Sequence, residues 1–123
     1  MKRFTPAEAT AMLPLVRRIV ADILTAGQSL RQFAERERFS DEHSPEFTAL
    51  KNALLGYFDE LEDLGCSYRD WNFSVGLVDF PAHINGREVL LCWKSDEQDV
   101  RFFHGTDEGF LGRKPIPAEL LEH

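Results

Sequence analysis

The chain has 123 residues, of which 43% are hydrophobic and 28% charged, a size and composition typical of one folded globular domain. Its formal net charge of −7 argues against a nucleic-acid-binding protein, because contacts to phosphate groups need a basic surface. No run approaches the ~20 apolar residues of a membrane span, and the start MKRFTPAEA lacks the apolar segment of a signal peptide. We therefore expect a cytoplasmic protein. In that reducing compartment its two cysteines, Cys66 and Cys92, are expected to be free thiols.

The first predicted element is a helix that begins at the capping box Thr5-Pro6-Ala7-Glu8, in which proline occupies the first helical position. Pro14 removes a backbone hydrogen bond and crowds the preceding turn, so we expect a short helix at 6–12, a kink, and a long helix at 14–38. The apolar residues alternate spacings of three and four, which indicates a helix that packs lengthwise on another: Leu13, Val16, Val20, Ile23, Gly27, Leu30 and Ala34.

A second helix is predicted after a loop at 39–44. Ser44-Pro45 repeats the start of a cap followed by proline, and Gly65 is the residue type that commonly ends a helix in the left-handed conformation. The apolar residues between them follow the same spacing: Phe47, Leu50, Leu54, Tyr57, Leu61 and Leu64. Two such helices joined by a short loop predict an antiparallel helical hairpin over residues 1–65.

The next part of the sequence changes to the alternating pattern of β-strands. Asn85-Gly86 is the strongest short signal for a hairpin with a type I′ turn, because both residues tolerate a positive φ angle. A two-residue turn places Ile84 opposite Arg87 and so defines the pairing of the two strands. A third strand is predicted at 99–104, after a loop at 95–98.

The tail at 105–123 contains three glycines and two prolines, and we expect it to be irregular. The predicted fold is therefore α+β, in a single domain of residues 1–123. A long antiparallel helical hairpin packs on a three-stranded antiparallel β-meander at 66–104, and the tail wraps around an edge of the sheet.

The predicted pairing separates the side chains of the sheet into two faces. Asp79 lies opposite Cys92 and His83 opposite Glu88, and these four residues share one face. The other face is apolar and is expected to pack on the helices: Val78, Phe80, Ala82, Ile84, Val89, Leu91 and Trp93.

The third strand extends both faces. With the loop at 95–98, Val100 and Phe102 join the apolar face, while Arg101 lies beside Cys92 and is the natural partner of Asp79. Three apolar residues also lie on the polar face, which is therefore half apolar: Pro81, Leu90 and Phe103. We expect this second face to be covered, either by tail residues (Phe110, Leu111 and Ile116) or by a second copy of the chain.

Acid, histidine and thiol groups are common ligands of zinc-like ions, so the polar face is a candidate site for a divalent metal. Asp79 and His83 are four residues apart on one strand, about 13 Å at ~3.3 Å per residue, which is too far for one ion. The polar residues therefore divide into two pairs, with His83 and Glu88 as a tentative metal pair. The alternative is structural: the pairs are cross-strand contacts, each worth a fraction of a kcal/mol when exposed.

Two other arrangements have weaker support. A thiol nucleophile needs a base, which His104 could provide for Cys92, but the predicted pairing places these residues on opposite faces. Arg113 and Lys114, in the segment GFLGRK, could bind an anion, although a solvated turn is the commoner role of such a segment.

The sequence resembles a small bacterial family known as domain of unknown function 2203 in three stretches: FTPAEATAMLPLVRRIV, LGCSYRDWNFSVGLVDFPAHINGREVLLCW and FFHGTDEGFLGR. The motif of the family maps onto Asp79, Phe80, Gly86, Cys92, Trp93, Glu97, His104, Gly109, Phe110 and Arg113. The chain departs from it at Asp96, where the motif has Gly, and at Arg69-Asp70-Trp71, where it has residues like Lys-Asp-Leu. The resemblance implies an α+β domain of the bacterial cytoplasm, without a known activity, cofactor or catalytic residue, and draws attention to Glu97 and His104.

Two hypotheses for the function remain. The first is a small, acidic, non-catalytic interaction module that forms a homodimer, because apolar and aromatic residues are in excess on the helices and on the second sheet face. The second is a protein that binds a metal or small ligand, with or without catalysis, through Asp79, Cys92, Glu97, Arg101 or His104. The observation that separates them is whether Asp79, Cys92 and His104 converge on one cavity.

Overall fold

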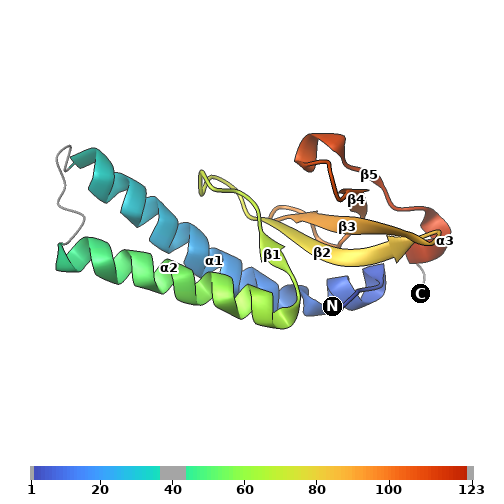
Figure 1. Cartoon of the computed structure of the whole chain (residues 1–123), viewed down its shortest axis with the longest axis horizontal. Coiled ribbons are helices and arrows are strands. Elements are labelled where there is room, and N and C mark those ends of the chain that lie inside the picture. Colours follow the sequence, from blue (N-terminus) through green and yellow to red (C-terminus); the bar gives the residue numbers. More distant parts are fainter. Residues whose placement is uncertain (1, 37–43, 122–123) are drawn as a thin grey trace.

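The structure is a computed structural model that describes residues 2–36 and 44–121. In chain order its elements are α1 (Pro6–Arg36), α2 (Pro45–Leu64), β1 (Ser67–Tyr68), β2 (Leu77–Ile84), β3 (Arg87–Lys94), β4 (Phe102–Gly105), the short 3-10 helix η1 (Phe110–Gly112), β5 (Lys114–Pro115) and α3 (Ala118–Leu121). Two long helices are followed by one antiparallel sheet, so the α+β prediction is confirmed (Figure 1). Within the described residues, no helix is both long and apolar enough to cross a membrane.

Helix α1 runs from Pro6 to Arg36 with Pro14 inside it, so the predicted division into a helix at 6–12 and a second helix at 14–38 is wrong. Leu13 and Val16, on either side of the proline, are fully buried, so the packing of this face outweighs the missing backbone hydrogen bond. The predicted capping box is confirmed, because the Thr5 amide donates to Glu8 Oε1 at 2.8 Å and the Glu8 amide donates to Thr5 Oγ1 at 3.1 Å. The predicted end at residue 38 lies outside the described residues.

Helix α2 begins and ends where the sequence predicts. The Ser44 hydroxyl accepts a hydrogen bond from the Phe47 amide at 3.1 Å, and Gly65 adopts φ 97° as the left-handed residue after the helix. The two helices pack against each other, with Phe33 of α1 on Phe47 of α2 at a ring distance of 6.2 Å. Of the predicted loop at 39–44, only Ser44 lies within the described residues.

The sheet has five strands in the order β1-β2-β3-β4-β5, rather than the three predicted. The three predicted strands correspond to β2, β3 and β4, and the additions at the two edges are only two residues long, too short to show a period. The tail is therefore less irregular than predicted, since β5 pairs with β4 and is preceded by η1 and followed by α3.

The pairing of β2 with β3 agrees with the prediction, and that of β3 with β4 differs by one residue. Asn85 and Gly86 both have positive φ angles, 53° and 79°, and Asp79 pairs with Cys92. In β4, Phe102 pairs with Cys92, where Arg101 was predicted. A shift of one residue moves every side chain to the opposite face, so the predicted faces of β4 are wrong.

The cause of the shift is a loop at 95–101 that is longer than predicted and is held by contacts outside the sheet. The Trp93 indole N–H donates to the Glu97 carbonyl at 2.9 Å, and the Val100 amide donates to Thr10 Oγ1 of α1 at 3.1 Å. Val100 is buried, as predicted, but it binds the helix rather than β3. The contact between Val100 and Thr10 joins residues that are far apart in the sequence, so no local pattern could reveal where the loop ends.

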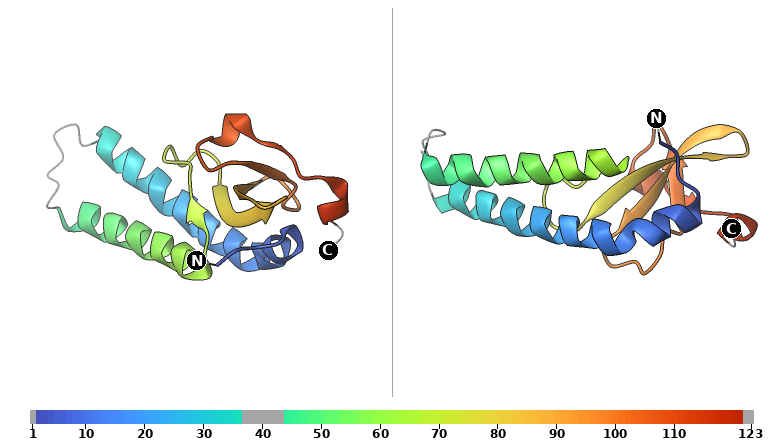
Figure 2. Two further views of the ribbon diagram at one scale, coloured as in Figure 1. Left: turned by 45° about the vertical axis from the view of Figure 1, so that its right-hand side comes forward. Right: turned by 90° about the horizontal axis from the view of Figure 1, so that it is seen from below.

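The core lies between the sheet and the helices. The apolar face of the sheet is buried as predicted, and it joins in one cluster with residues of α1 (Ala9, Leu13, Val16, Ile19, Val20 and Ile23) and of α2 (Leu54 and Leu61). The first half of α1 runs along the sheet, while the other ends of both helices extend beyond it (Figures 1 and 2). Only part of the helical hairpin therefore packs on the sheet.

A well-braced loop, residues 69–76, connects β1 to β2. The Asp70 carboxylate accepts hydrogen bonds from the amides of Asn72, Ser74 and Val75, at 3.1, 2.9 and 2.8 Å. Phe73 has φ 56°, and its ring occupies the space next to Gly27 of α1, where a β-carbon would lie 2.2 Å from the ring. The loop is thus bound both to itself and to the helix.

Candidate functional site

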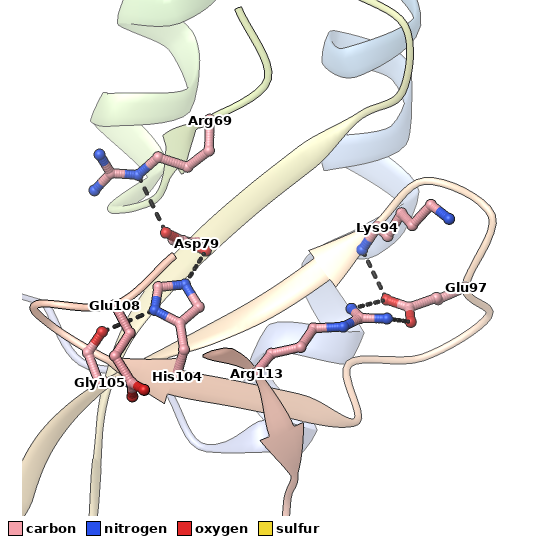
Figure 3. Close-up of polar contacts among 8 residues, drawn as sticks. All are labelled: Arg69, Asp79, Lys94, Glu97, His104, Gly105, Glu108 and Arg113. Carbon is pink, nitrogen blue, oxygen red and sulfur yellow. Dashed lines mark hydrogen bonds and ion pairs between the residues drawn. The ribbon is translucent and has the colours of Figure 1, made fainter. Parts of the chain in front are cut away.

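Asp79 is a buried carboxylate on β2 that has two cationic or protonated partners. Its Oδ2 atom accepts a hydrogen bond from Arg69 Nε at 3.1 Å, and its Oδ1 atom lies 3.0 Å from His104 Nε2 (Figure 3). The predicted partner, Arg101, is instead exposed and pairs with Asp99 at 3.1 Å. That prediction is wrong because the shift in β4 turns Arg101 away from Cys92 and brings His104 onto the face of Asp79.

Both ring nitrogens of His104 lie within hydrogen-bond distance of an oxygen atom. Nδ1 lies 2.8 Å from the Gly105 carbonyl oxygen, which can only accept, so Nδ1 carries a hydrogen. In a neutral ring, Nε2 then presents a lone pair to the Asp79 carboxylate, and two acceptors cannot bond to each other. A hydrogen on Nε2 that is donated to Oδ1, or a metal ion bound by both atoms, would each account for this contact.

Cys92 on β3 completes a buried cluster with these two residues. Burial raises the pKa of its thiol to about 11, and the charge of Asp79 adds to the effect, while Arg113 opposes it. Such a thiol is protonated at neutral pH and is a poor nucleophile, although a metal ion displaces the proton of a coordinating thiol. Cys92 and His104 share one face, contrary to the prediction, yet this thiol lacks the lowered pKa of a catalytic nucleophile.

The three residues, which we call the Asp79–Cys92–His104 cluster, fit a transition-metal site. One ligand atom from each lies within 4.8 Å of the other two. Zinc bonds of about 2.0–2.3 Å place tetrahedral ligand atoms roughly 3.5 Å apart, so the side chains need to move inward by only about 1 Å. His104 also has the outer contact typical of metal-binding histidines, with its second ring nitrogen bound to a backbone carbonyl.

A pocket of about 240 Å³ opens directly onto this cluster. Leu77, Leu90 and Phe110 supply apolar walls, and three polar residues complete it: Arg69, Thr106 and Glu108. Phe110 reaches the pocket from η1, so the tail covers part of the second sheet face. Of the other tail residues expected there, Leu111 is 98% exposed and Ile116 is buried in the main core.

Glu97 and Arg113 form a separate ion pair beside Cys92. The guanidinium group donates to both carboxylate oxygens, at 2.9 and 2.5 Å (Figure 3). It also lies over the rings of Phe102 and Phe110. Hydrogen bonding to Glu97 raises the pKa of Arg113. Both side chains are mostly buried, and the Lys94 amide donates to Glu97 Oε1 at 2.8 Å. The pair ties the tail to the loop before β4 and leaves little of Arg113 for an external anion.

His83 and Glu88 lie apart from the cluster, near the hairpin turn. They face each other as predicted, with His83 Nε2 3.7 Å from Glu88 Oε1, and both are exposed. Glu88 also binds Arg3 at 2.6 Å, which lowers the pKa of Glu88. Among the described residues, no third acid, histidine or cysteine lies close enough to complete a metal site with this pair.

Comparison with known proteins gives a family but no activity. The sequence profile of the family described as "Uncharacterized conserved protein (DUF2203)" matches residues 2–116. The chain belongs to this family. No curated protein and no solved structure matches it. The DUF2203 assignment confirms the resemblance seen in the sequence, and the chemistry of the site has to be argued from its own geometry.

Arg69 is the main residue of the site that the sequence did not reveal. It follows the two-residue strand β1, whose Ser67 pairs with Asp79, so the chain brings its guanidinium group to that carboxylate. A signal was available in principle, because an acid on a buried strand needs a cation nearby. The sequence analysis chose Arg101 for this role, and only the short edge strand, which the sequence did not show, brings Arg69 to Asp79.

Proposed function

We propose that this DUF2203 protein binds one divalent transition metal ion, of the zinc type, through Asp79, Cys92 and His104. The observation that carries the proposal is that these three buried groups converge at one pocket, with His104 Nε2 aimed at Asp79 Oδ1 at 3.0 Å. A carboxylate, a thiolate and an imidazole are all zinc ligands.

The surroundings of the cluster support an open rather than a closed metal site. Structural zinc sites have four protein ligands, while sites that act on small molecules have three and keep one position for water or a ligand. The cluster offers three ligand atoms and faces a pocket. Asp79 is held by Arg69 and His104 by the Gly105 carbonyl, contacts that orient ligands before a metal binds.

Metal titration of chelator-treated protein tests the proposal. We expect one zinc or cobalt ion per chain and a higher melting temperature in its presence, because a ligand that binds only the folded state stabilises it. Asp79→Asn and Cys92→Ser should lose both effects. Cys66→Ser and His83→Gln are matched controls, a second buried thiol and an exposed histidine, and should keep them.

The result that would refute metal binding is purified protein without metal, whose melting temperature does not change with zinc, nickel or manganese. In that case the Asp79–His104 contact holds a proton, and the cluster is a structural hydrogen-bond network.

The second candidate function is a non-catalytic interaction module that forms a homodimer in the bacterial cytoplasm. The observation that favours it is the exposure of Trp71 and Leu111, 62% and 98%, close in sequence to the pocket residues Arg69 and Phe110. The unpaired thiols of Cys66 and Cys92 agree with a reducing compartment. The two candidates are compatible, because Trp71 and Leu111 are not part of the metal cluster.

A further inference from the structure

The pocket beside the Asp79–Cys92–His104 cluster limits the size and the chemistry of the ligand that it can hold. Its volume of about 240 Å³ equals that of roughly eight water molecules at about 30 Å³ each, so it admits a small molecule and not a polymer segment. One side of it is apolar, formed by Leu77, Leu90 and Phe110. Its ligand therefore has a short apolar body beside whatever polar group meets the metal.

Arg69 provides the cationic wall of this pocket. Its Nε atom is bound to Asp79, whereas its two terminal nitrogens have no hydrogen-bond partner among the described residues and point away from the carboxylate in Figure 3. The side chain is half exposed at the pocket. A guanidinium group held at one edge presents its other donors in a planar fork that matches a carboxylate.

The other charged residue of the pocket wall is Glu108. Glu108 stands on the wall and is fixed by the Gly105 amide, which donates to its Oε1 at 2.8 Å. A bound divalent ion balances Asp79 and the Cys92 thiolate, so Arg69 and Glu108 remain, one of each sign. Phosphate would meet the same cation and the same repelling carboxylate as a monocarboxylate, and it has no apolar body to lie against Leu77, Leu90 and Phe110.

We propose that the metal-loaded pocket binds a small monocarboxylate with a short apolar chain. The carboxylate takes the open metal position, Arg69 is the cation of the pocket wall, and the chain lies against Leu77, Leu90 and Phe110. This inference rests on the proposed metal binding, and it assigns Arg69 as the residue that selects the ligand by its charge.

The test uses the cobalt-loaded protein, whose visible spectrum reports the ligands of the ion. We expect butyrate to change this spectrum and to bind in calorimetry, and butyramide, of the same shape without the charge, to do neither. Inorganic phosphate should bind more weakly than butyrate. Arg69→Met should weaken butyrate by about tenfold or more, the effect of losing a charged hydrogen-bonded pair.

Three variants complete the design. Arg69→Lys keeps the charge but loses the planar fork, so we expect an affinity for butyrate between those of the wild type and Arg69→Met. Arg101→Met is the matched control, since Arg101 is exposed and pairs with Asp99 away from this pocket, and it should bind butyrate as the wild type does. Cobalt titration of each variant shows whether it is folded and can bind metal.

The outcomes separate the two proposals. If the wild type takes up cobalt but binds butyramide as well as butyrate, or phosphate more tightly, the carboxylate inference is wrong and metal binding stands. The same holds if Arg69→Met binds both cobalt and butyrate like the wild type. If the wild type takes up no cobalt, the proposed function fails and this inference fails with it.

Discussion

The thiol of Cys66 acts as a hydrogen-bond donor in the fold, because its Sγ lies 3.5 Å from the Leu61 carbonyl oxygen at the end of α2. Burial raises the pKa of this thiol from 9.0 to about 12. The folded state therefore holds the thiol proton more tightly than the unfolded state does, and stability depends on that proton.

The stability of the protein should accordingly fall in alkaline solution. The contribution of Cys66 is complete below pH 9 and is lost as the pH rises toward about 12, since only the unfolded chain releases the proton over that range. One thiol changes the free energy of unfolding by up to about 1.4 kcal/mol per pH unit. Urea unfolding measured at several pH values should show a shallower decline in Cys66→Ala, and equal slopes would contradict the assignment.

The residues of the site differ in how far the sequence could predict them. Asp79 and Cys92 follow from the hairpin turn, because Asn85 and Gly86 determine which residues of β2 and β3 face each other. His104 does not follow, since its face depends on a loop whose length is set by contacts with α1. The family motif pointed to His104, but only the structure places it beside Asp79.

At the scale of the elements, the sequence predicted the features that depend on local signals, and it did not predict those that depend on long-range packing. The caps of α1 and α2 and the pairing of the hairpin appear in the structure as predicted, while Ala34 of the predicted apolar spacing is exposed. Pro14 was a local signal of the same strength, yet the burial of neighbouring residues keeps α1 continuous through it. The two-residue edge strands had no local signal at all.

Two glycines of these elements should respond in opposite ways to substitution by alanine. Gly86 has φ 79° in the hairpin turn, where a β-carbon costs about 1–2 kcal/mol, so Gly86→Ala should lower the free energy of unfolding by about that amount. Gly56 lies in α2 with nothing near its absent β-carbon, so Gly56→Ala should raise it by up to about 1 kcal/mol. Chemical denaturation of both variants checks the pair, and a stabilising Gly86→Ala would rule out the type I′ turn.

The whole molecule is a sheet with a helical hairpin that reaches well past it, an extended outline for a short chain (Figure 2). The sequence predicted both halves of this arrangement but not their offset, because the apolar seams of α1 and α2 continue beyond the length that the sheet can cover.

The oligomeric state is a second property of the whole molecule. If the exposed Trp71 and Leu111 form a dimer contact, light scattering should give twice the 14.1 kDa of one chain. Replacing both by Glu should then yield the monomer, because charges are unfavourable at the centre of an interface. Leu15→Glu, on the exposed side of α1, is the control and should leave the mass unchanged. A monomeric wild type at micromolar concentration would contradict the homodimer.

The ring of Phe73 fills the space above Gly27, so the residue type at one of these two positions restricts the residue type at the other. Any side chain at residue 27 would displace the ring, and with it the loop that carries Arg69 to the pocket. Within the family, a larger residue at 27 is therefore compatible only with a smaller one at 73. Covariation of these two positions would record, in sequences alone, that the helical hairpin and the pocket have evolved as one unit.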